Sequence, residues 1–313
     1  MAKVMYTRSK LTDSHEVDRV SQDVSFTARD EVLLLPFLLE QLSSRGRNKV
    51  KSLLTRKQVS VDGHLVSRHD YILHRGQIVT VHAQGFRPAG WATLAFGLKL
   101  LYEDDDIIVV DKPPGLLTIA TDKEKERTAY RVLMDHVQQK DPASRVFIVH
   151  RLDKETSGVM MFAKSEKVKR DLQDNWTDVV SERSYVAVVE GHVGREQGTI
   201  ETWLKETSTQ LMYVSPHGVG DLAVTHYHVL QRTKQYSLLR ITLQTGRKNQ
   251  IRVHMQHIGH SVAGDKRYGA KTNPLLRHAL HAQILALIHP VTKRELRFET
   301  AIPSSFLTLT KPV

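Results

Sequence analysis

Apolar residues follow a helical period early in this chain and a mostly strand-like period from Leu101 onward. Helical spacing is found at Leu33–Leu42 and again at Asn48–Gln58. Alternating apolar residues follow at Val59–Val61 and Ile78–Val81, and this is the period of a half-buried strand. Two helices followed by short strands predict a small α/β domain in the first part of the chain.

The second part of the chain is dominated by short apolar runs and alternating segments. Strands are expected at Ile107–Val110, Val146–Val149, Gly158–Ala163, Tyr185–Val189 and Leu239–Leu243. Helices are expected after the N-capping residues Thr128 and Ser165, and a third helix is expected after Asn249, ending at Gly259. Many strands with short connections predict a mixed, mainly antiparallel sheet flanked by helices, so the fold class is α+β.

These patterns divide the chain into four segments. Residues 1–30 are polar without a sustained period, so we expect a flexible tail that ends in a short strand near Phe26. Residues 31–82 form the small domain, and residues 83–100, which are rich in Gly and Pro, form a linker. Residues 101–313 form the large domain.

Positive charge is concentrated in the small domain. The chain has 45 Lys and Arg against 34 Asp and Glu, a formal net charge of +11. Residues 31–82 alone carry eight basic and four acidic side chains, and a localised excess is typical of nucleic-acid binding. At 100° per residue, Arg45, Lys49 and Arg56 lie within about 40° of one another on the second helix. We expect this face to meet phosphate oxygens, and an ordinary solvated helix face is the alternative.

Composition excludes several classes of protein. The chain has no cysteine, which excludes disulfides, zinc–thiolate sites and thiol nucleophiles. Its longest apolar stretch, Val32–Leu39, is too short for a membrane span, and the N-terminus lacks the regions of a signal peptide. The phosphate-binding patterns GxGxxG and GxxxxGK[ST] do not occur, so no nucleotide cofactor is expected. We therefore expect a cytoplasmic protein that does not bind membranes. Separately from these features, a monomer is expected.

Candidate chemistry is concentrated in the segment His150–Gly158, which reads HRLDKETSG and lies between two expected strands. A loop held by buried strands is a rigid support for a catalytic group. Asp153 stands close to Arg151 and Lys154, and nearby cations favour the ionised carboxylate. Such a carboxylate can act as a nucleophile, a base or a stabiliser of a cationic, sugar-like transition state. A structural turn with an ion pair is the alternative.

A second polar segment, Thr245–Arg252, reads TGRKNQIR and leads into the expected third helix. Arg252 is expected on the first turn of this helix, beside its apolar stripe. From there the guanidinium could pair with a carboxylate of another element and hold it ionised. A surface or phosphate-contacting arginine is the alternative.

Together these segments resemble the RluA family of pseudouridine synthases, whose signature is similar to His150–Gly158. Further segments match that family in the same order, namely Asp111–Gly115, Tyr185 in a strand, Thr245–Arg252, Gly264-Asp265 with Tyr268-Gly269, Leu280–Ala282 and His289-Pro290. The small domain resembles the RNA-binding domain of ribosomal protein S4 in Ser44-Arg45, the basic helix, Val59–Gly63 and Gly76–Val79. The combination is similar to two-domain members that modify uridines in large-subunit ribosomal RNA.

The resemblance implies a reaction on RNA that needs neither metal nor cofactor. The enzyme cleaves the N1–C1′ bond of a uridine, turns the base and rejoins it through C5. Asp153 is implied as the catalytic aspartate, with Tyr185 packed against the uracil and Arg252 paired with Asp153. Arg151 is implied to keep the target nucleotide flipped out, because a stacked uridine hides the bond to be broken. Contacts to RNA are expected from Arg45, Lys49, Arg56, Arg247 and Asn249.

Two positions depart from the common pattern of the family. Many members have His where Asn249 stands, and because Asn is a good N-cap we interpret this change as structural. Arg183 stands two residues before Tyr185, where Lys is common, and it can serve a similar electrostatic purpose although the two side chains are not equivalent.

Other functions and sites are alternatives to this interpretation. The substrate could be transfer RNA instead of ribosomal RNA. A non-catalytic RNA-binding assembly factor with the same fold would have a damaged active site, whereas the implied catalytic residues are all present. His254, His257 and His260 have the spacing of zinc ligands, but no carboxylate lies near them, so we expect packed or exposed histidines. Trp176 is expected in the core, on the helix that follows Ser165.

Overall fold

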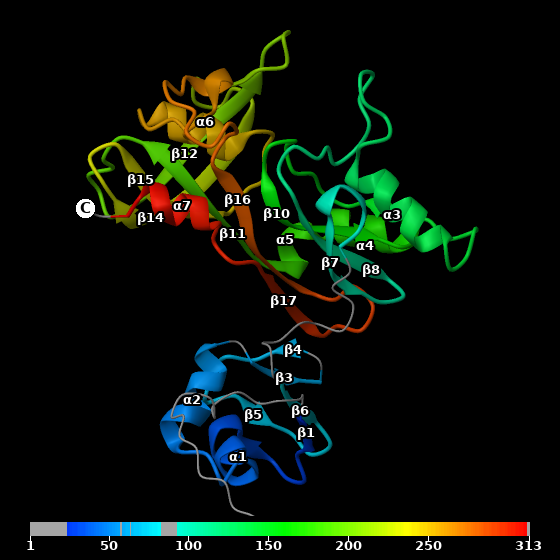
Figure 1. Ribbon diagram of the computed structural model, residues 1–313. Helices are drawn as coiled ribbons and strands as arrows, with labels where there is room; N and C mark the ends of the chain where they lie inside the picture. Colours follow the sequence, from blue (N-terminus) through cyan, green and yellow to red (C-terminus); the bar gives the residue numbers. More distant parts are fainter. Residues whose placement is uncertain (1–23, 57, 63, 83–92, 312–313) are drawn as a thin grey trace, which may run out of the picture. The chain divides into compact units, whose positions relative to one another are not determined.

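The computed structural model describes residues 24–56, 58–62, 64–82 and 93–311. The chain forms two compact units that divide between Ala89 and Gly90, called here the small unit and the large unit. Figure 1 shows the small unit in blue to cyan and the large unit in teal to red. Most of the expected tail, up to residue 23, and residues 83–92 of the expected linker lie outside the described residues.

The small unit is a pair of helices packed on small antiparallel sheets. Its strands are β1 (Val24–Thr27), β2 (Val32–Leu33), β3 (Val59–Val61), β4 (His64–Leu65), β5 (Ile72–Leu73) and β6 (Ile78–Val81). One sheet has the order β1-β6-β3-β4, and β2 pairs with β5. The helices α1 (Leu34–Gln41) and α2 (Arg47–Thr55) bury their apolar residues against these strands. The two helices and the two longer strands expected from the sequence are confirmed.

Two boundaries of the small unit differ from the expectation. The short strand near Phe26 is confirmed as β1, but it pairs with β6 along its whole length, so the folded unit begins before residue 31. At the other end, Leu98 is buried in the core of the large unit and β7 (Lys99–Glu103) follows it directly. The expected linker therefore extends too far, because its last residues already belong to the large unit.

The basic helix is shorter than the sequence pattern indicated. Gly46 has extended backbone angles (φ −63°, ψ 149°), so α2 begins at Arg47, one residue before the expected start, and it ends at Thr55, three residues before the expected end. Arg45 and Arg56 therefore flank the helix. The prediction that they share a helical face with Lys49 is wrong, because only Lys49 lies within α2. The basic side chains on α2 itself, Arg47, Lys49 and Lys51, are all exposed.

The large unit is built on one long twisted sheet with the order β13-β12-β14-β15-β11-β16-β10-β8-β7. Besides β7, its strands are β8 (Ile107–Lys112), β9 (Phe147–Ile148), β10 (Ser157–Ala163), β11 (Val180–Glu190), β12 (Gln197–Glu206), β13 (Met212–Ser215), β14 (Asp221–Arg232), β15 (Tyr236–Leu243), β16 (Leu280–Ile288) and β17 (Glu295–Glu299). β17 pairs with β16, and β9 pairs with β10. Among the described strands, β10 and β16 form a parallel pair and the other pairs are antiparallel. The expected mixed, mainly antiparallel sheet is confirmed.

Helices and 3-10 turns flank this sheet, as Figure 1 shows. They are η1 (Ala95–Gly97), α3 (Ala129–Gln138), α4 (Glu166–Asp174), α5 (Trp176–Val179), α6 (Gln250–His257), η2 (Lys266–Tyr268) and α7 (Ser304–Leu309). The two expected caps are confirmed, because the Thr128 hydroxyl accepts the Arg131 N–H at 3.0 Å and the Ser165 hydroxyl accepts the Val168 N–H at 3.2 Å. α6 contacts β13 and β14, and α7 contacts β11 and β15.

Trp176 does not lie on the helix that Ser165 begins. That helix ends at Asp174, where the Asn175 side chain donates to the Asp171 carbonyl at 3.0 Å, and Trp176 opens the separate helix α5. Trp176 still packs against the cluster that contains Val168 and Leu172, but it is only partly buried. None of the helices in the described ranges combines the length and apolar character needed to cross a membrane.

Candidate active site

The loop that carries Asp153 leads from β9 into β10, and hydrogen bonds fix its backbone on both sides of the aspartate. The Thr118 hydroxyl donates to the Leu152 carbonyl at 2.8 Å and accepts the Leu152 N–H at 3.3 Å. On the other side, the Thr156 N–H donates to the Asp153 carbonyl at 3.1 Å and closes a turn. The Asp153 side chain is therefore mounted on a loop whose backbone is already positioned.

Lys112, at the end of β8, holds this loop through its backbone. Its side chain is fully buried, and its ammonium donates to the carbonyls of Pro113 (3.0 Å), Leu116 (2.8 Å) and Lys154 (3.0 Å). Burial lowers its pKa to about 7, against the opposing effect of the Glu155 and Asp153 charges. From the sequence this lysine was only part of a matching segment. The sequence feature that could have pointed to Lys112 is its position: a charged residue at the end of an apolar strand, directly before Pro-Pro-Gly.

Gly158 ties the same loop to β16. In the parallel pair of β10 and β16, Gly158 lies opposite Ala282, and a Cβ added to Gly158 would stand 2.0 Å from the Ala282 carbonyl oxygen. Its φ of +111° is also one that glycine alone adopts readily. Two side-chain bonds continue this junction, from Thr156 to His278 (2.9 Å) and from Ser157 to His281 (2.8 Å).

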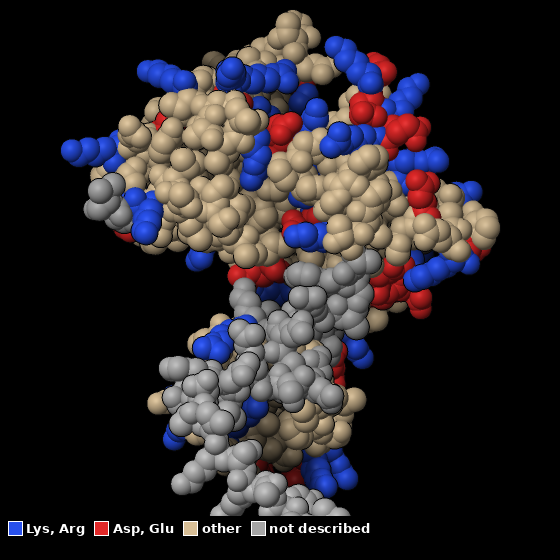
Figure 2. Space-filling view, in the orientation of Figure 1, with Lys and Arg blue, Asp and Glu red and all other residues tan. Residues whose placement is uncertain are grey.

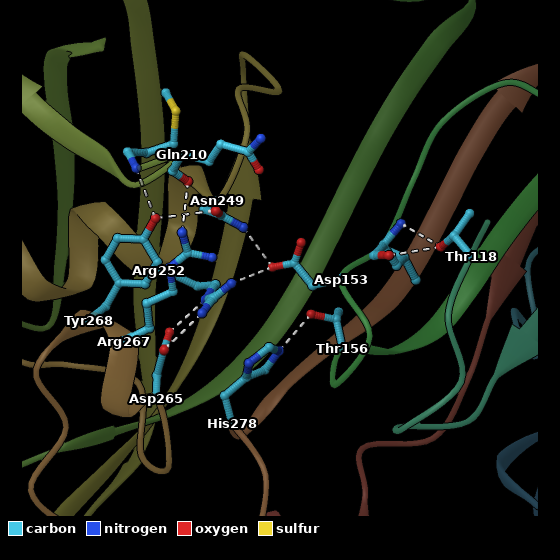
Figure 3. A network of polar contacts seen from close by, with 12 residues as sticks. Thr118, Asp153, Thr156, Gln210, Asn249, Arg252, Asp265, Arg267, Tyr268 and His278 are labelled. Carbon is cyan, nitrogen blue, oxygen red and sulfur yellow. Dashed lines mark hydrogen bonds and ion pairs between the residues drawn. The ribbon is translucent and has the colours of Figure 1, made fainter. Parts of the chain in front are cut away.

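Asp153 and Arg252 form an ion pair, as Figure 3 shows. The Arg252 Nη1 donates to Asp153 Oδ2 at 2.8 Å. The same guanidinium donates from Nε and Nη2 to both oxygens of Asp265, at 2.6 and 2.8 Å. One buried cation thus lies between two carboxylates, of which Asp265 is 2% and Asp153 is 37% exposed. Burial opposes the Arg252 charge, but the two carboxylates outweigh it and raise the Arg252 pKa.

Asn249 also reaches Asp153, and it does so in place of capping its helix. Its backbone is left-handed (φ 52°, ψ 18°), and its side chain makes no hydrogen bond to the first turn of α6. The amide Nδ2 donates to Asp153 Oδ2 at 2.8 Å, and the amide oxygen accepts from the Tyr268 hydroxyl at 3.2 Å. The interpretation of Asn249 as an N-cap is therefore wrong, because its side chain bonds to Asp153 and Tyr268 and not to the first turn of α6. Gln250 instead accepts the Arg247 N–H at 2.9 Å.

Tyr185 lies in β11 at the level of the Asp153 loop. Across the sheet, Tyr185 is opposite Ala282 of β16, which is itself opposite Gly158 of β10. The ring is partly buried and packs against two of the core clusters. Burial raises the pKa of its hydroxyl; the Arg183 charge opposes this shift and the Asp153 charge adds to it. Tyr185 is thus close enough to both charges to be influenced by them.

Arg183 supplies a half-buried cation on the same strand. It makes no ion pair with the part of the chain that the structure describes, and burial lowers its pKa. Its guanidinium lies 5.9 Å from the centre of the Trp176 ring, and a Cβ added to Gly246 would stand 2.4 Å from Nη1. Arg183 therefore brings positive charge close to Tyr185, as expected from the sequence.

The remaining expected RNA-contacting residues are not part of this cluster. Arg151 is exposed and makes no hydrogen bond or ion pair within the described ranges. Arg247 is exposed as well, and its Nε donates to the Leu222 carbonyl at 3.0 Å. Arg45, Lys49 and Arg56 belong to the small unit, and the structure leaves their role as a prediction.

Several residues of the cluster had no role expected from the sequence. Asp265 and Tyr268 belong to segments that match the family, but no role was expected for them. The sequence feature that could have pointed to them is that each stands next to a glycine, Gly264 or Gly269. In the structure, Asp265 holds Arg252, and the Tyr268 ring centre lies 4.7 Å from the Arg252 guanidinium carbon. His278 is buried behind the loop, where burial lowers its pKa to about 4.

Among the described residues, Asp104, Asp106 and His289 form a group with the side-chain composition of a metal site. The hydrogen bonds of His289 argue against that use. Its Nδ1 accepts the N–H groups of Val291 (3.2 Å) and Thr292 (2.9 Å), so Nε2 carries the proton and donates to Asp104 at 2.9 Å. Asp104 and Asp106 belong to the turn between β7 and β8, and His289, which follows β16, donates to that turn.

Comparisons with known proteins agree with this arrangement. A model of the RNA pseudouridylate synthase family matches residues 106–257. Ribosomal large subunit pseudouridine synthase D of Vibrio cholerae is 34% identical over 291 residues, which is 87% of this chain and 88% of the relative. The protein of the same name from Pseudomonas aeruginosa is 32% identical over 278 residues, 84% of this chain and 86% of the relative.

Solved structures show the same fold. Human RNA pseudouridylate synthase domain containing 4 has a TM-score of 0.55 at 24% identity, over 66% of this chain and 90% of that one. Human RNA pseudouridylate synthase domain containing 1 has a TM-score of 0.53 at 24% identity, over 66% of this chain and 84% of that one. The family resemblance read from the sequence is confirmed, and the chain belongs to the RluA family of RNA pseudouridine synthases.

Proposed function

We propose that this protein isomerises uridine to pseudouridine in large-subunit ribosomal RNA, with Asp153 as its catalytic carboxylate. One observation carries the proposal: Asp153 is a half-exposed carboxylate on a rigid loop, with one oxygen held by Arg252. The relatives in Vibrio cholerae and Pseudomonas aeruginosa are named for the ribosomal large subunit, which supports this substrate over transfer RNA.

The reaction is an isomerisation, so every carbon, nitrogen and oxygen atom of the uridine stays in the product. The N1–C1′ bond breaks, the uracil turns, and a C5–C1′ bond forms in its place. The C5 proton leaves and N1 gains a proton. Asp153 contacts the reacting nucleotide. Arg252 fixes the carboxylate and neutralises part of its charge, since hydrogen bonds between charged groups are stronger and more directional than neutral ones.

Tyr185 and Arg151 are proposed to act on the base and on the flipped-out nucleotide. The Tyr185 ring, partly buried and close enough to feel the Asp153 charge, offers an apolar surface for a uracil, and its hydroxyl is proposed to assist removal of the C5 proton. Arg151 is exposed two residues before Asp153 and is free of partners within the described ranges. It can therefore contact the space that the target nucleotide leaves on flipping.

The small unit is proposed to dock on structured RNA, as its resemblance to the S4-type domain implies. Its exposed basic residues at and around α2 can neutralise phosphates. Figure 2 shows further Lys and Arg side chains at the upper edge of the large unit, where they can contact RNA as well. We propose a monomer acting in the cytoplasm, as expected from the sequence.

The proposal predicts that Asp153→Asn abolishes pseudouridine formation and leaves RNA binding intact. The amide keeps the shape of the side chain but loses the charge that the chemistry needs. Formation can be measured as release of tritium from RNA labelled at uridine C5, and binding by filter retention of the same RNA. Near-normal turnover of Asp153→Asn would refute the assignment of Asp153.

The substrate can be tested with two unmodified transcripts, large-subunit ribosomal RNA and a pool of transfer RNA. We expect tritium release from the ribosomal transcript, and mapping of pseudouridines in it should show a small set of modified positions. Release from the transfer RNA pool alone would overturn the ribosomal assignment. Binding of either RNA without release by the unaltered protein would favour a non-catalytic factor.

A further inference from the structure

The two oxygens of Asp153 are in different surroundings. Oδ2 accepts two hydrogen bonds, from Asn249 Nδ2 and from Arg252 Nη1, both at 2.8 Å. Oδ1 accepts none from the residues that the structure describes, and Figure 3 shows it pointing away from both donors. The side chain is 37% exposed, so Oδ1 is the oxygen open to an incoming nucleotide.

We propose that Asn249 is a positioning residue of the reaction, which together with Arg252 selects Oδ1 as the oxygen that meets the target uridine. The inference rests on the proposed function of Asp153 and adds to it. Asn249 was interpreted from the sequence as a structural substitution, and its contacts give it a different task.

A second donor is needed because Arg252 contributes only one of its N–H groups to Asp153. Its other two bonding N–H groups are committed to Asp265. A carboxylate held by a single donor can turn about its last bond, since that torsion is broad. Two donors from different side chains that converge on Oδ2 remove this freedom and leave Oδ1 in a fixed position.

The Asn249 amide is itself oriented by a chain of hydrogen bonds. The Met212 N–H donates to the Tyr268 hydroxyl at 3.2 Å, and that hydroxyl donates to the Asn249 amide oxygen at 3.2 Å. With its acceptor role used, the hydroxyl has its proton left for Asn249. The opposite amide orientation would bring an amide oxygen against the Asp153 carboxylate. The chain therefore fixes Nδ2 as the group that faces Asp153.

The backbone at this position also suits asparagine. A φ of +52° lies in the left-handed region, which Asn and Gly adopt more readily than other residues. Asn249→Gly thus removes the amide without adding backbone strain, whereas Asn249→Ala removes the amide and adds strain. The two variants separate the hydrogen bond from the backbone conformation.

We expect Asn249→Gly to lower kcat by about 10- to 100-fold, the usual effect of losing a hydrogen bond to a charged group. The KM for a large-subunit ribosomal RNA transcript should stay within about twofold, because binding does not depend on which oxygen faces the base. Asn249→Ala should show the same kcat together with a lower Tm. Tyr268→Phe removes the hydroxyl that orients the Asn249 amide, but the amide itself stays in the protein. This variant should therefore lower kcat less than Asn249→Gly does.

Asn175→Gly is the matched control, since it makes the same exchange at an exposed asparagine between α4 and α5. It should leave kcat unchanged. An unchanged kcat in Asn249→Gly with a reduced kcat in Asn249→Ala would assign the residue to the backbone alone and overturn the inference. A raised KM with unchanged kcat would assign it to RNA binding, with the same consequence.

The Asp153→Asn variant keeps this test separate from that of the proposed function. If Asp153→Asn is inactive while Asn249→Gly is normal, the positioning role fails and the proposed function stands. If Asp153→Asn keeps its turnover, the catalytic assignment itself fails, and the positioning role fails with it.

Discussion

Arg252 is the residue on which the charge arrangement of the site depends. Its buried guanidinium spans two carboxylates, and this requires the fork of donors that arginine has and lysine lacks. Removing one partner from a buried ion pair is costly because it leaves an uncompensated charge. Asp265, which is almost fully buried, is the partner that would be left.

Arg252→Lys should therefore lower kcat by at least about 100-fold and destabilise the large unit by about 3 kcal/mol. A single ammonium cannot reach both oxygens of Asp265 and Oδ2 of Asp153 together. Single-turnover tritium release and urea unfolding measure the two effects. Arg170→Lys, in an exposed pair with Glu166, is the control and should change stability by less than about 0.5 kcal/mol. Equal effects in the two variants would contradict this account.

The pairing of Arg252 with an aspartate could be expected from the sequence, but its second partner could not. Arg252 and Asp265 are 13 residues apart, and Asp265 lies beyond the end of α6, so no helical spacing marks them as partners. The error at Asn249 has the same origin. Its local context favours an N-cap, and only the folded chain places Asp153 and Tyr268, 96 and 19 residues away, within reach of the amide.

At the scale of elements, the parallel pair of β10 and β16 joins the Asp153 loop to the middle of the sheet. The sequence predicted β10 as a strand, but a local pattern cannot identify the strand that pairs with it when that strand lies more than 100 residues away. The glycine of the signature segment explains the close approach, because Ala282 lies where a side chain at 158 would be. This glycine is therefore required by packing and not by the chemistry.

Gly158→Ala is expected to destabilise the large unit by about 3 kcal/mol or more, since overpacking and a strained φ each cost about 1–3 kcal/mol. Activity should fall as well, because the Asp153 loop moves with β10. Gly115→Ala is the matched control: its φ is also positive, at +81°, but nothing lies within 4 Å of the added Cβ. Its loss of stability should be clearly smaller. A similar loss in both variants would show that strain, and not the Ala282 contact, dominates.

The basic residues at α2 are the second feature at this scale, and they require a prediction that does not assume a common helical face. Replacing Arg45, Lys49 and Arg56 by Ala should weaken binding of the ribosomal transcript. It should also reduce the slope of log affinity against log salt by about 0.7–0.9 for each phosphate that the protein no longer neutralises. Arg68→Ala is the control, because Arg68 is already paired with Asp70. An unchanged slope in the triple variant would remove these residues from the RNA interface.

Four histidines of the large unit have surroundings that favour the neutral form. Burial lowers the pKa of His150, His254, His278 and His281 to about 4, from an ordinary value of 6.5. They come from the Asp153 loop, from α6, from the segment before β16 and from β16 itself. Their neighbours use them as neutral hydrogen-bonding groups, as Thr202 and Thr225 do with the two ring nitrogens of His254.

This burial predicts that the large unit loses stability in mild acid. Between pH 6.5 and 4 the unfolded chain binds protons that the folded unit excludes, so the free energy of unfolding falls as the pH falls. Each histidine contributes up to about 1.4 kcal/mol per pH unit. Urea unfolding at pH 7.5, 6 and 5 measures the slope. Tryptophan fluorescence reports this unit through Trp176 and Trp203, which lie in α5 and β12.

The contribution of a single histidine can be isolated on α6, which carries a buried and an exposed one. His254→Gln should reduce the slope of unfolding free energy against pH by up to about 1.4 kcal/mol per unit below pH 6.5, because glutamine does not take up a proton. It should also lower stability at pH 7.5, where the fit to Thr202 and Thr225 is lost. His257→Gln, at an exposed position on the same helix, should leave the slope nearly unchanged. If the two variants had the same slope, acid instability would have to arise from groups other than the buried histidines.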